Sequence, residues 1–337
     1  MATDGVGLQA MDAPVHPALR GFLDKLNALP IVPPGSLAPL ARRQLFASFA
    51  SGHAGDVLPM HRVEDRTLPT PDGASCNLRV YWPAAGGERP LVLYMHGGGW
   101  HAGSIATHDA LCRRLAAASG CIFASLEYRM APEVLPPTSV NDAIAAFRWL
   151  REHGAELGGD ASRIALAGDS AGGSIAAAAC LLLRDAPDVD VQPIAQFLIY
   201  PSTDLTASSG ASYDAYADGY YLRTASVHHY GDVYLGDSGV LKTDARVSPL
   251  LASSHAQLPP AYIVTAQYDP IRSDGEAYAR VLRASGVRVE YTALSGMIHA
   301  WMNMLSLSPD LCEQLHDMGK QFAHFIGYAA PTIVTAE

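Results

Sequence analysis

The sequence has no long hydrophobic run. Its longest uninterrupted apolar stretch, residues 175–183, has nine residues, whereas a membrane-spanning helix needs about 20. The N-terminus lacks the basic region followed by an apolar region that marks a secretory signal. No Asn-x-Ser/Thr glycosylation sequon occurs either. These absences predict a cytoplasmic protein without a membrane partner.

Cysteine is scarce, and its spacing suggests no pairing. The cysteines are odd in number, scattered and free of C-x-x-C spacing: Cys76, Cys112, Cys121, Cys180 and Cys312. This pattern disfavours a disulfide framework or a zinc site and predicts buried thiols in a reducing compartment. No His-Glu-x-x-His motif occurs. His96, His101 and His108, near the glycine run that follows residue 96, are expected to form hydrogen bonds within their loop. We therefore expect no metal.

Basic residues are few compared with acidic ones. The 337 residues include 23 Lys and Arg against 33 Asp and Glu, which gives a net charge of −10 and no long basic run. Such a surface repels phosphate backbones, so no nucleic-acid partner is expected. With 49 % hydrophobic and 17 % charged residues, the chain is expected to bury a sizeable core in one large domain or two ordinary ones.

Short apolar runs alternate with helical patterns through most of the chain. We expect strands at residues 61–67, 77–82, 91–95, 122–126, 164–167, 195–200, 261–266 and 287–292. Helices are expected between them at 107–119, 140–153, 171–183 and 274–285, with a last one at 310–325. This alternation predicts an α/β fold with a mostly parallel sheet and helices on both of its faces.

Two segments depart from this rhythm. The first 50 residues contain two helical patterns, at 16–29 and 37–51, separated by Pro33-Pro34-Gly35. Residues 202–254 have six tyrosines but little strand character, which is typical of a functional insertion rather than a plain loop. We predict that residues 1–50 and 202–254 form a helical cap, and that 51–201 and 255–337 form the catalytic domain.

The strongest motif is Gly168-Asp169-Ser170-Ala171-Gly172, which fits G-x-S-x-G. An apolar strand precedes it and an alanine-rich helix follows it, so the serine must lie in a sharp turn that exposes its hydroxyl. The first N–H groups of the new helix point toward the same place. We interpret Ser170 as a nucleophile; the alternative is a glycine-rich turn that only packs helix against sheet.

A second glycine motif, His96-Gly97-Gly98-Gly99-Trp100, directly follows the strand at 91–95. Backbone N–H groups of such a run can point into a pocket and hold the oxyanion that forms during acyl transfer. A rival interpretation is a dinucleotide-binding loop, with Glu127 ending the next strand. It is disfavoured because Trp100 is bulky where a phosphate must approach and because residues 100–104 look like a loop. A plain turn is the third alternative.

A nucleophilic serine needs a base and an acid that orients it, in the chain order Ser, Asp or Glu, His. Asp269 follows the strand at 261–266, at the edge of the sheet where α/β sites lie; its alternative role is to start an Asp-Pro turn. Asp204 is a weaker contender, and Asp274 is expected to cap the next helix.

Three histidines follow Asp269 in the chain. His316 and His324 fall inside the last helical pattern, whereas His299 lies in a predicted loop at 295–299. We therefore select His299 as the base. The alternative, a loop histidine with a purely structural role, would leave Ser170 without a base.

Five motifs in this order resemble those of hormone-sensitive-lipase-like carboxylesterases, within the α/β-hydrolase superfamily. They span residues 91–301: the two glycine motifs above, Tyr128-Arg129-Met130-Ala131-Pro132-Glu133, Asp269-Pro270-Ile271-Arg272 and Gly296-Met297-Ile298-His299. The resemblance implies an α/β-hydrolase fold with an eight-stranded sheet and a helical cap. It also implies a serine esterase for short to medium acyl chains that works through an acyl-enzyme, needs no cofactor and often forms homodimers.

The resemblance assigns roles to individual residues. Ser170 would be the nucleophile, His299 the base and Asp269 its partner. The oxyanion donors would be Gly98, Gly99 and Ala171, supported by His96 and Gly97. The sequence departs from the family pattern at Glu127, Ser273 and Ala300-Trp301, and the last of these departures is expected to affect the acyl-chain preference. A hydrolase of an amide, carbamate or formamide, or a non-catalytic small-molecule-binding protein on the same scaffold, remains an alternative.

Overall fold

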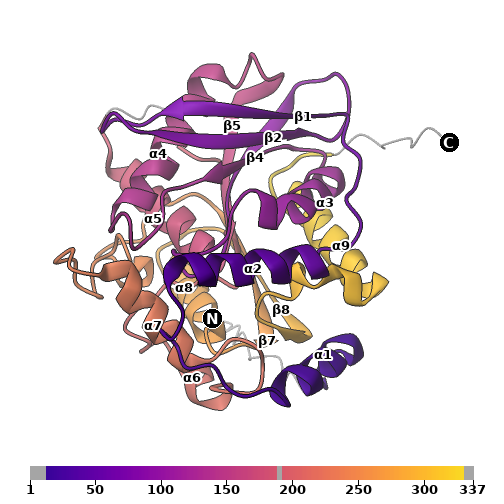
Figure 1. Cartoon of the computed structure of the whole chain (residues 1–337). Coiled ribbons are helices and arrows are strands. Elements are labelled where there is room, and N and C mark those ends of the chain that lie inside the picture. The colour runs from indigo at the N-terminus through magenta and orange to yellow at the C-terminus, as the bar shows by residue number, and fades with distance from the viewer. Residues whose placement is uncertain (1–12, 188–191, 330–337) are drawn as a thin grey trace, which may run out of the picture.

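A single sheet runs through the computed structural model, which describes residues 13–187 and 192–329 (Figure 1). Its strands follow the order β1-β2-β4-β3-β5-β6-β7-β8. Their bounds are β1 Arg62–Pro69, β2 Ser75–Trp82, β3 Arg89–Met95, β4 Ile122–Glu127, β5 Gly159–Asp169, β6 Gln196–Ile199, β7 Ala261–Tyr268 and β8 Val289–Ile298. The pairs β1–β2 and β2–β4 are antiparallel and the others are parallel. The predicted eight-stranded, mostly parallel sheet is confirmed.

Every predicted strand is present, but one boundary matters for the site. Residues 295–298, predicted as a loop, belong to β8, so that prediction was wrong. Ser295-Gly296 has turn-like composition, yet β8 continues to pair with β7 across an irregularity, and Ile298 lies opposite Tyr268. His299 therefore follows directly from the end of a strand.

Helices cover both faces of the sheet, as predicted. On one side, α4 Thr138–His153, α5 Ala171–Asp185 and α8 Arg272–Ala284 share a core with the sheet, and on the other side α3 Asp109–Ser119 and α9 Pro309–Phe325 share a second core. Strand β3 shows the division: Leu91, Leu93 and Met95 belong to the first core, and Val92 and Tyr94 to the second. Alternate side chains of a strand point to opposite faces, so this buried strand is apolar on both faces from Leu91 to Met95.

Four further α-helices pack beside these layers. They are α1 Pro17–Asn27, α2 Pro39–His53, α6 Ser212–Ala215 and α7 Thr224–Leu235, and all lie in the lower half of Figure 1. Leu19 and Leu23 of α1 belong to the second core. A proline opens α1 and another opens α2, where a missing N–H costs no hydrogen bond. Arg42 of α2 contacts the hydroxyl of Tyr230 in α7. The two irregular segments of the sequence thus meet in space.

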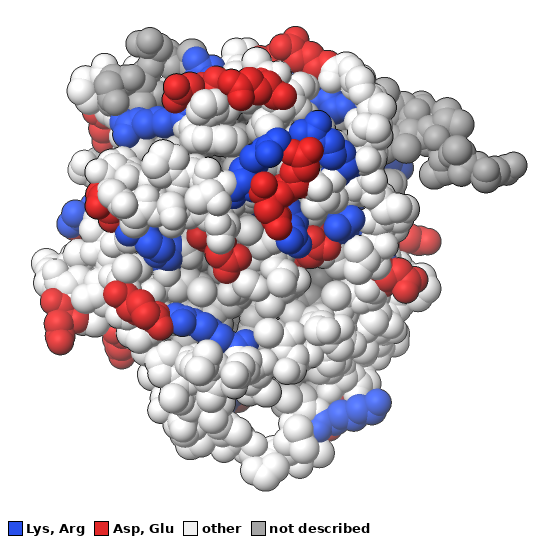
Figure 2. Space-filling view, turned by 45° about the horizontal axis from the view of Figure 1, so that its top comes forward, with Lys and Arg blue, Asp and Glu red and all other residues white. Residues whose placement is uncertain are grey.

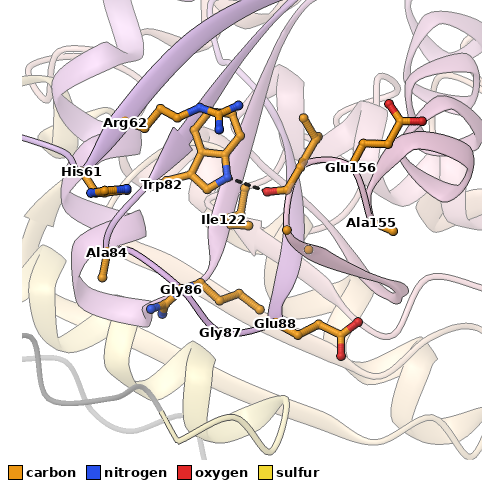
Figure 3. Close-up of a pocket in the computed structure, with 14 residues that line it drawn as sticks. His61, Arg62, Trp82, Ala84, Gly86, Gly87, Glu88, Ile122, Ala155 and Glu156 are labelled. Atoms are coloured by element: carbon orange, nitrogen blue, oxygen red, sulfur yellow. Dashed lines mark hydrogen bonds between the residues drawn. The ribbon is translucent and has the colours of Figure 1, made fainter.

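A cavity of about 510 Å³ lies where the parallel strands begin (Figure 3). Arg89, Ile122 and Gly159, which start or nearly start β3, β4 and β5, help to line it. The indole N–H of Trp82 donates to the carbonyl of Leu157 across its wall, at 2.7 Å. Active sites of open α/β sheets lie beyond the opposite, carboxyl ends of the strands, so this cavity is separate from the candidate site described below.

Acidic and basic side chains are interspersed on the face shown in Figure 2. Ion pairs also join strands β1 and β2, where Arg79 pairs with Asp65 at 2.7 Å, and lie within β1, where Arg66 pairs with Glu64. On that face, the described residues form no broad basic patch of the kind that tracks a phosphate backbone. In the described ranges, no helix combines the length and apolarity needed to cross a membrane.

Candidate active site

Ser170 lies at the junction of β5 and α5. Its backbone has φ 54° and ψ −119°, a conformation that side-chain-bearing residues rarely adopt. The turn is tight, since a Cβ at Gly172 would overlap the carbonyl oxygen of Met95. A strained serine between strand and helix exposes its hydroxyl at the edge of the sheet, which is the geometry of a nucleophile elbow.

His299 lies between Ser170 and Asp269. Its Nε2 is 3.0 Å from the serine Oγ, and its Nδ1 is 2.7 Å from Oδ2 of Asp269. The other oxygen of Asp269 accepts from the N–H of Ile271 at 3.0 Å. Because an ionised carboxylate only accepts hydrogen bonds, Nδ1 carries the imidazole proton, and the lone pair of Nε2 faces the hydroxyl. Asp269 is fully buried and His299 is 5 % exposed, whereas Ser170 is only partly buried, so the serine end of the series is the one open to a substrate.

The other acid and base candidates do not reach this group. Asp204 accepts from Thr206 and Ser208 in its own loop, and His316 and His324 lie on α9. The expectation that Asp274 caps a helix was wrong.

Asp274 lies inside the first turn of α8, whose N-cap is Ile271. Its buried carboxylate instead accepts from the N–H of Thr203 at 3.0 Å and from the hydroxyls of Ser209 and Tyr213 at 2.6 and 3.0 Å. These donors are about 60 to 70 positions away in the chain, so a local capping pattern could not reveal them.

The glycine loop presents two free backbone donors near Ser170. The carbonyl of Gly98 accepts from the N–H of Ala102 at 3.0 Å and of His101 at 3.4 Å. Since N–H and C=O point in opposite directions across a trans peptide, the N–H of Gly99 is turned away from that bonded carbonyl. Within the described residues, nothing accepts from the N–H of Gly98 or Gly99. Ala171, the first residue of α5, adds an N–H that has no acceptor within its helix.

Glycine is required in this loop for steric reasons. Gly98 has φ +128°, and a Cβ there would overlap the carbonyl of Ala102. The next helical segment begins only at residue 106, and α3 begins at Asp109. The glycines therefore do not open a helix, as a dinucleotide-binding loop requires.

His96 and Gly97 hold the start of the loop. The Nδ1 of His96 is 2.9 Å from the carbonyl of Gly97, and its ring stacks on Tyr128 with centroids 4.3 Å apart. Burial lowers the pKa of His96 to about 3, so the ring is neutral near neutral pH, and Nδ1–H donates to that carbonyl. This bond orients the peptide unit that carries the N–H of Gly98.

Comparison with known proteins agrees with this geometry. A family model described as "alpha/beta hydrolase fold" matches residues 92–303. Esterase LipI of Mycobacterium tuberculosis is 40 % identical over 76 % of this chain and 80 % of its own length. The chain belongs to the hormone-sensitive-lipase-like carboxylesterase family of α/β hydrolases.

Other members of this α/β-hydrolase family extend the comparison. The carboxylic ester hydrolase LipN of the same bacterium is 41 % identical over 73 % of this chain, which spans 65 % of the length of LipN. The crystal structure of a thermostable esterase from Pseudomonas putida superposes with a TM-score of 0.86 at 34 % identity, covering 93 % of this chain and 98 % of the other. The shared fold therefore includes nearly all of this chain.

Sequence reasoning missed a buried group behind the glycine loop of this α/β hydrolase. Oδ1 of Asp169 accepts from the hydroxyl of Tyr94 at 2.7 Å and from the N–H of Gly97 at 2.8 Å, and Nε2 of His108 lies 3.5 Å away. Burial raises the pKa of Asp169, but His108 and these donors outweigh it and lower the pKa overall. In the sequence analysis Asp169 appeared only as the variable residue of G-x-S-x-G, with no role of its own. Its position next to Ser170 was the one available signal.

The cysteines and metal-ligating side chains of the hydrolase are dispersed. Cys76, Cys112, Cys121 and Cys180 are free and buried, as predicted, whereas Cys312 is only partly buried. Among the described residues, no cluster of three or more His, Cys, Asp or Glu side chains could hold a metal ion. The histidines near the glycine loop make hydrogen bonds, for example His108 with the hydroxyl of Thr107 at 2.8 Å.

Two buried histidines of the loop should make the folded hydrolase sensitive to acid. The pKa of His101 is lowered to about 4, mainly by burial, and that of His96 to about 3, whereas a histidine in an unfolded chain titrates near pH 6.5. Between about pH 6.5 and pH 4 the unfolded chain binds protons that the folded chain does not, so the free energy of unfolding falls as the pH falls. We expect a loss of up to about 1.4 kcal/mol per pH unit for each histidine.

Urea unfolding of the wild type and of His101→Asn between about pH 7 and pH 5 checks this expectation. The asparagine amide can still donate to the carbonyl of Gly99, which now accepts from His101 at 2.7 Å, but it does not titrate. The variant should therefore lose stability less steeply than the wild type. Equal slopes would exclude His101 as a source of the acid sensitivity.

Proposed function

We propose that this chain is a serine carboxylesterase that hydrolyses esters of short to medium acyl chains through an acyl-enzyme intermediate. The observation that carries the proposal is the hydrogen-bonded series Ser170–His299–Asp269 beside the free amides of the glycine loop. The names of the relatives support it, since they are called carboxylic ester hydrolase, carboxylesterase and arylesterase. We assign Ser170 as the nucleophile, His299 as the base and Asp269 as its orienting acid.

The first half of the reaction forms the acyl-enzyme. Nε2 of His299 takes the proton of the Ser170 hydroxyl while Oγ bonds to the ester carbonyl carbon. The carbonyl oxygen becomes an oxyanion that accepts from the amides of Gly98, Gly99 and Ala171. The carbon–oxygen bond to the alcohol then breaks, and the alcohol leaves with the proton held by His299.

The second half repeats these steps with water. His299 removes a proton from a water molecule that attacks the acyl carbonyl, and it then returns a proton to Oγ of Ser170 as the acid leaves. Asp269 stabilises the imidazolium in both halves without taking its proton. In enzymes of this kind each oxyanion donor contributes about 2.7–4 kcal/mol to the barrier reduction, so the three amides are a large part of the catalysis.

We propose that residues 1–50 and 202–254 form a cap over this site, and that 51–201 and 255–337 form the catalytic domain. Residues 1–12, 188–191 and 330–337 of these ranges lie outside the described part of the chain. Tyr230 of α7 supports the cap assignment, since a Cβ on Gly99 would lie 2.8 Å from its ring. Phe22, Phe49 and Tyr221, from α1, α2 and the insertion, pack their rings together with centroids 5.4 to 6.0 Å apart.

The cap also bears on the acyl-chain preference. The aromatic rings of these segments provide an apolar environment for an acyl chain. Tyr200 packs its ring 4.6 Å from that of His299, and Trp301, where the family pattern differs, is fully buried. The fixed ring of Tyr200 beside the base supports a preference for short and medium chains over long ones.

The test is a rate series over p-nitrophenyl esters from acetate to palmitate, with the matching anilide of the best acyl group. We expect kcat/KM to be highest for short or medium chains and to be much lower for palmitate and for the anilide. A faster anilide would indicate an amide hydrolase instead. Complete absence of turnover, together with no labelling by a fluorophosphonate, would indicate a binding protein on this scaffold.

We further propose that the enzyme acts in the cytoplasm on a small-molecule ester, as a homodimer, without a nucleic-acid or membrane partner. Buried free thiols are typical of proteins from a reducing compartment. The homodimer rests on the family resemblance alone. Sedimentation of the purified protein gives its oligomeric state directly.

A further inference from the structure

One arginine of α2 contacts the main chain of the glycine loop. Nε of Arg43 donates to the carbonyl of His101 at 2.9 Å, and its Nη2 donates to the carbonyl of Ala131 at 2.9 Å. The same guanidinium makes a bidentate pair with the carboxylate of Glu133, at 2.8 and 2.6 Å. Arg43 is 25 % exposed, whereas Glu133 is 60 % exposed. The guanidinium therefore joins three segments that are far apart in the chain.

The contact at His101 continues to the candidate oxyanion donors. The N–H of His101 and the N–H of Ala102 hold the carbonyl of Gly98, whose peptide unit carries the N–H of Gly99. Nδ1 of His101 lies 2.7 Å from the carbonyl of Gly99. Since burial lowers the pKa of His101 to about 4, the ring is neutral, and Nδ1–H is the donor. His101 thus fixes the peptide units on both sides of the Gly99 Cα atom.

The contact at Ala131 reaches the same loop from the other side. The N–H of Ala131 donates to the carbonyl of Trp100 at 3.0 Å, while the carbonyl of Ala131 accepts from Arg43. Trp100 and His101 are consecutive, so Arg43 restrains two neighbouring positions of the loop, one directly and one through Ala131. A loop with positive φ at Gly98, Gly99 and Trp100 has little regular structure of its own to maintain its shape.

We propose that Arg43 is a positioning residue that couples helix α2 to the oxyanion loop and keeps the N–H of Gly99 aimed at the reacting carbonyl. The inference rests on the proposed esterase activity. Oxyanion donors are effective because they are held in place before the reaction starts. A misplacement of about 1 Å can lower a rate by about 100-fold. Loss of the guanidinium should therefore affect the chemical step more than ground-state binding.

The experiment compares Arg43→Met, Glu133→Gln and Arg20→Ala with the wild type. Methionine keeps an apolar stem but no donor. Glu133→Gln removes the charged partner and leaves both carbonyl contacts of Arg43 available. Arg20 is a matched cap arginine on α1 that is 48 % exposed and lies 3.9 Å from Asp24. We measure kcat, KM and the thermal midpoint, with p-nitrophenyl butyrate as substrate.

The expected result is a split between the two kinetic constants. Arg43→Met should lower kcat by at least about 10-fold with KM within about threefold of the wild type. Glu133→Gln and Arg20→Ala should keep kcat within about twofold, because exposed ion pairs contribute little. The inhibition constant of a trifluoromethyl ketone, which forms an oxyanion in the same place, should rise in parallel with the fall in kcat.

Several results would overturn the proposal. One is a kcat for Arg43→Met within twofold of the wild type; another is an equal loss in Glu133→Gln, which would assign the effect to the ion pair. If Arg43→Met does not fold, Arg43→Lys decides: it keeps the positive charge but loses the planar fork that donates to the two carbonyls from two separate nitrogens, and an unchanged kcat would refute the role. A wild type that hydrolyses no ester would refute the proposed function instead, so the two failures are distinguishable.

Discussion

Ser170→Ala should lower the hydrolysis of p-nitrophenyl butyrate by roughly 10⁴- to 10⁶-fold. Alanine removes the one oxygen that lies 3.0 Å from Nε2 of His299, and no acyl-enzyme can then form. The remaining activity would come from the loop amides and from substrate binding alone. The measurement is the initial rate, corrected for spontaneous hydrolysis, together with labelling by a fluorophosphonate.

The variant should fold normally, because backbone hydrogen bonds hold the turn: the N–H of Ser170 donates to the carbonyl of Ile199 at 2.9 Å, and its carbonyl accepts from Ser174 and Ser202 at 3.2 Å. Circular dichroism and the thermal midpoint check this point. Ser162→Ala is a matched control: Ser162 lies near the start of the same strand, β5, and is exposed. If Ser170→Ala retains a tenth of the wild-type rate, or is still labelled, Ser170 is not the nucleophile.

Asp269→Asn should lower kcat by about 10⁴-fold while leaving KM nearly unchanged. The side-chain amide of asparagine can donate to Nδ1 of His299, which stabilises the tautomer with its proton on Nε2. Nε2 would then face the hydroxyl of Ser170 as a donor and could not accept its proton. The substitution would also remove the negative charge of the fully buried Asp269, which stabilises the imidazolium.

Asp204→Asn is the control for this prediction, since both aspartates follow strands at the same edge of the sheet. The carboxylate of Asp204 accepts from Thr206 and Ser208 in its own loop, so this variant should keep most of its activity. A large loss in Asp204→Asn combined with high activity in Asp269→Asn would transfer the orienting role to Asp204. Thermal midpoints of both variants separate a catalytic loss from a loss of folded protein.

Much of the fold was predictable because its signals are local. Short apolar runs and amphipathic helical patterns indicate the alternation of strands and helices, and every predicted strand has a counterpart in the sheet. The sharp turn at Ser170 follows from glycines on either side of a strand–helix junction. His299 could be selected because, of the three histidines after Asp269, it was the only one outside the last helical pattern.

The exact ends of the strands and the hydrogen-bond partners of buried polar side chains were harder to predict from the sequence. The extension of β8 to Ile298 depends on its pairing with β7. The local residue composition does not predict that pairing. Asp274 accepts from a segment about 70 residues earlier, and Asp169 accepts from Tyr94 and Gly97 across 75 and 72 residues. Asp274 had a plausible local role, as a helix cap, that these long-range contacts replaced, whereas no role was predicted for Asp169.

The sequence by itself determined the order of the elements, the residue types of the candidate site and the turns that expose them. These properties depend on neighbours in the chain, through steric limits on φ and through hydrophobic periodicity. Only the tertiary structure decided the distance from His299 to Ser170 and the link from Arg43 to the glycine loop. Such contacts join groups that are remote in the chain, and they form only when the packed sheet and the helices around it fix the intervening segments in space.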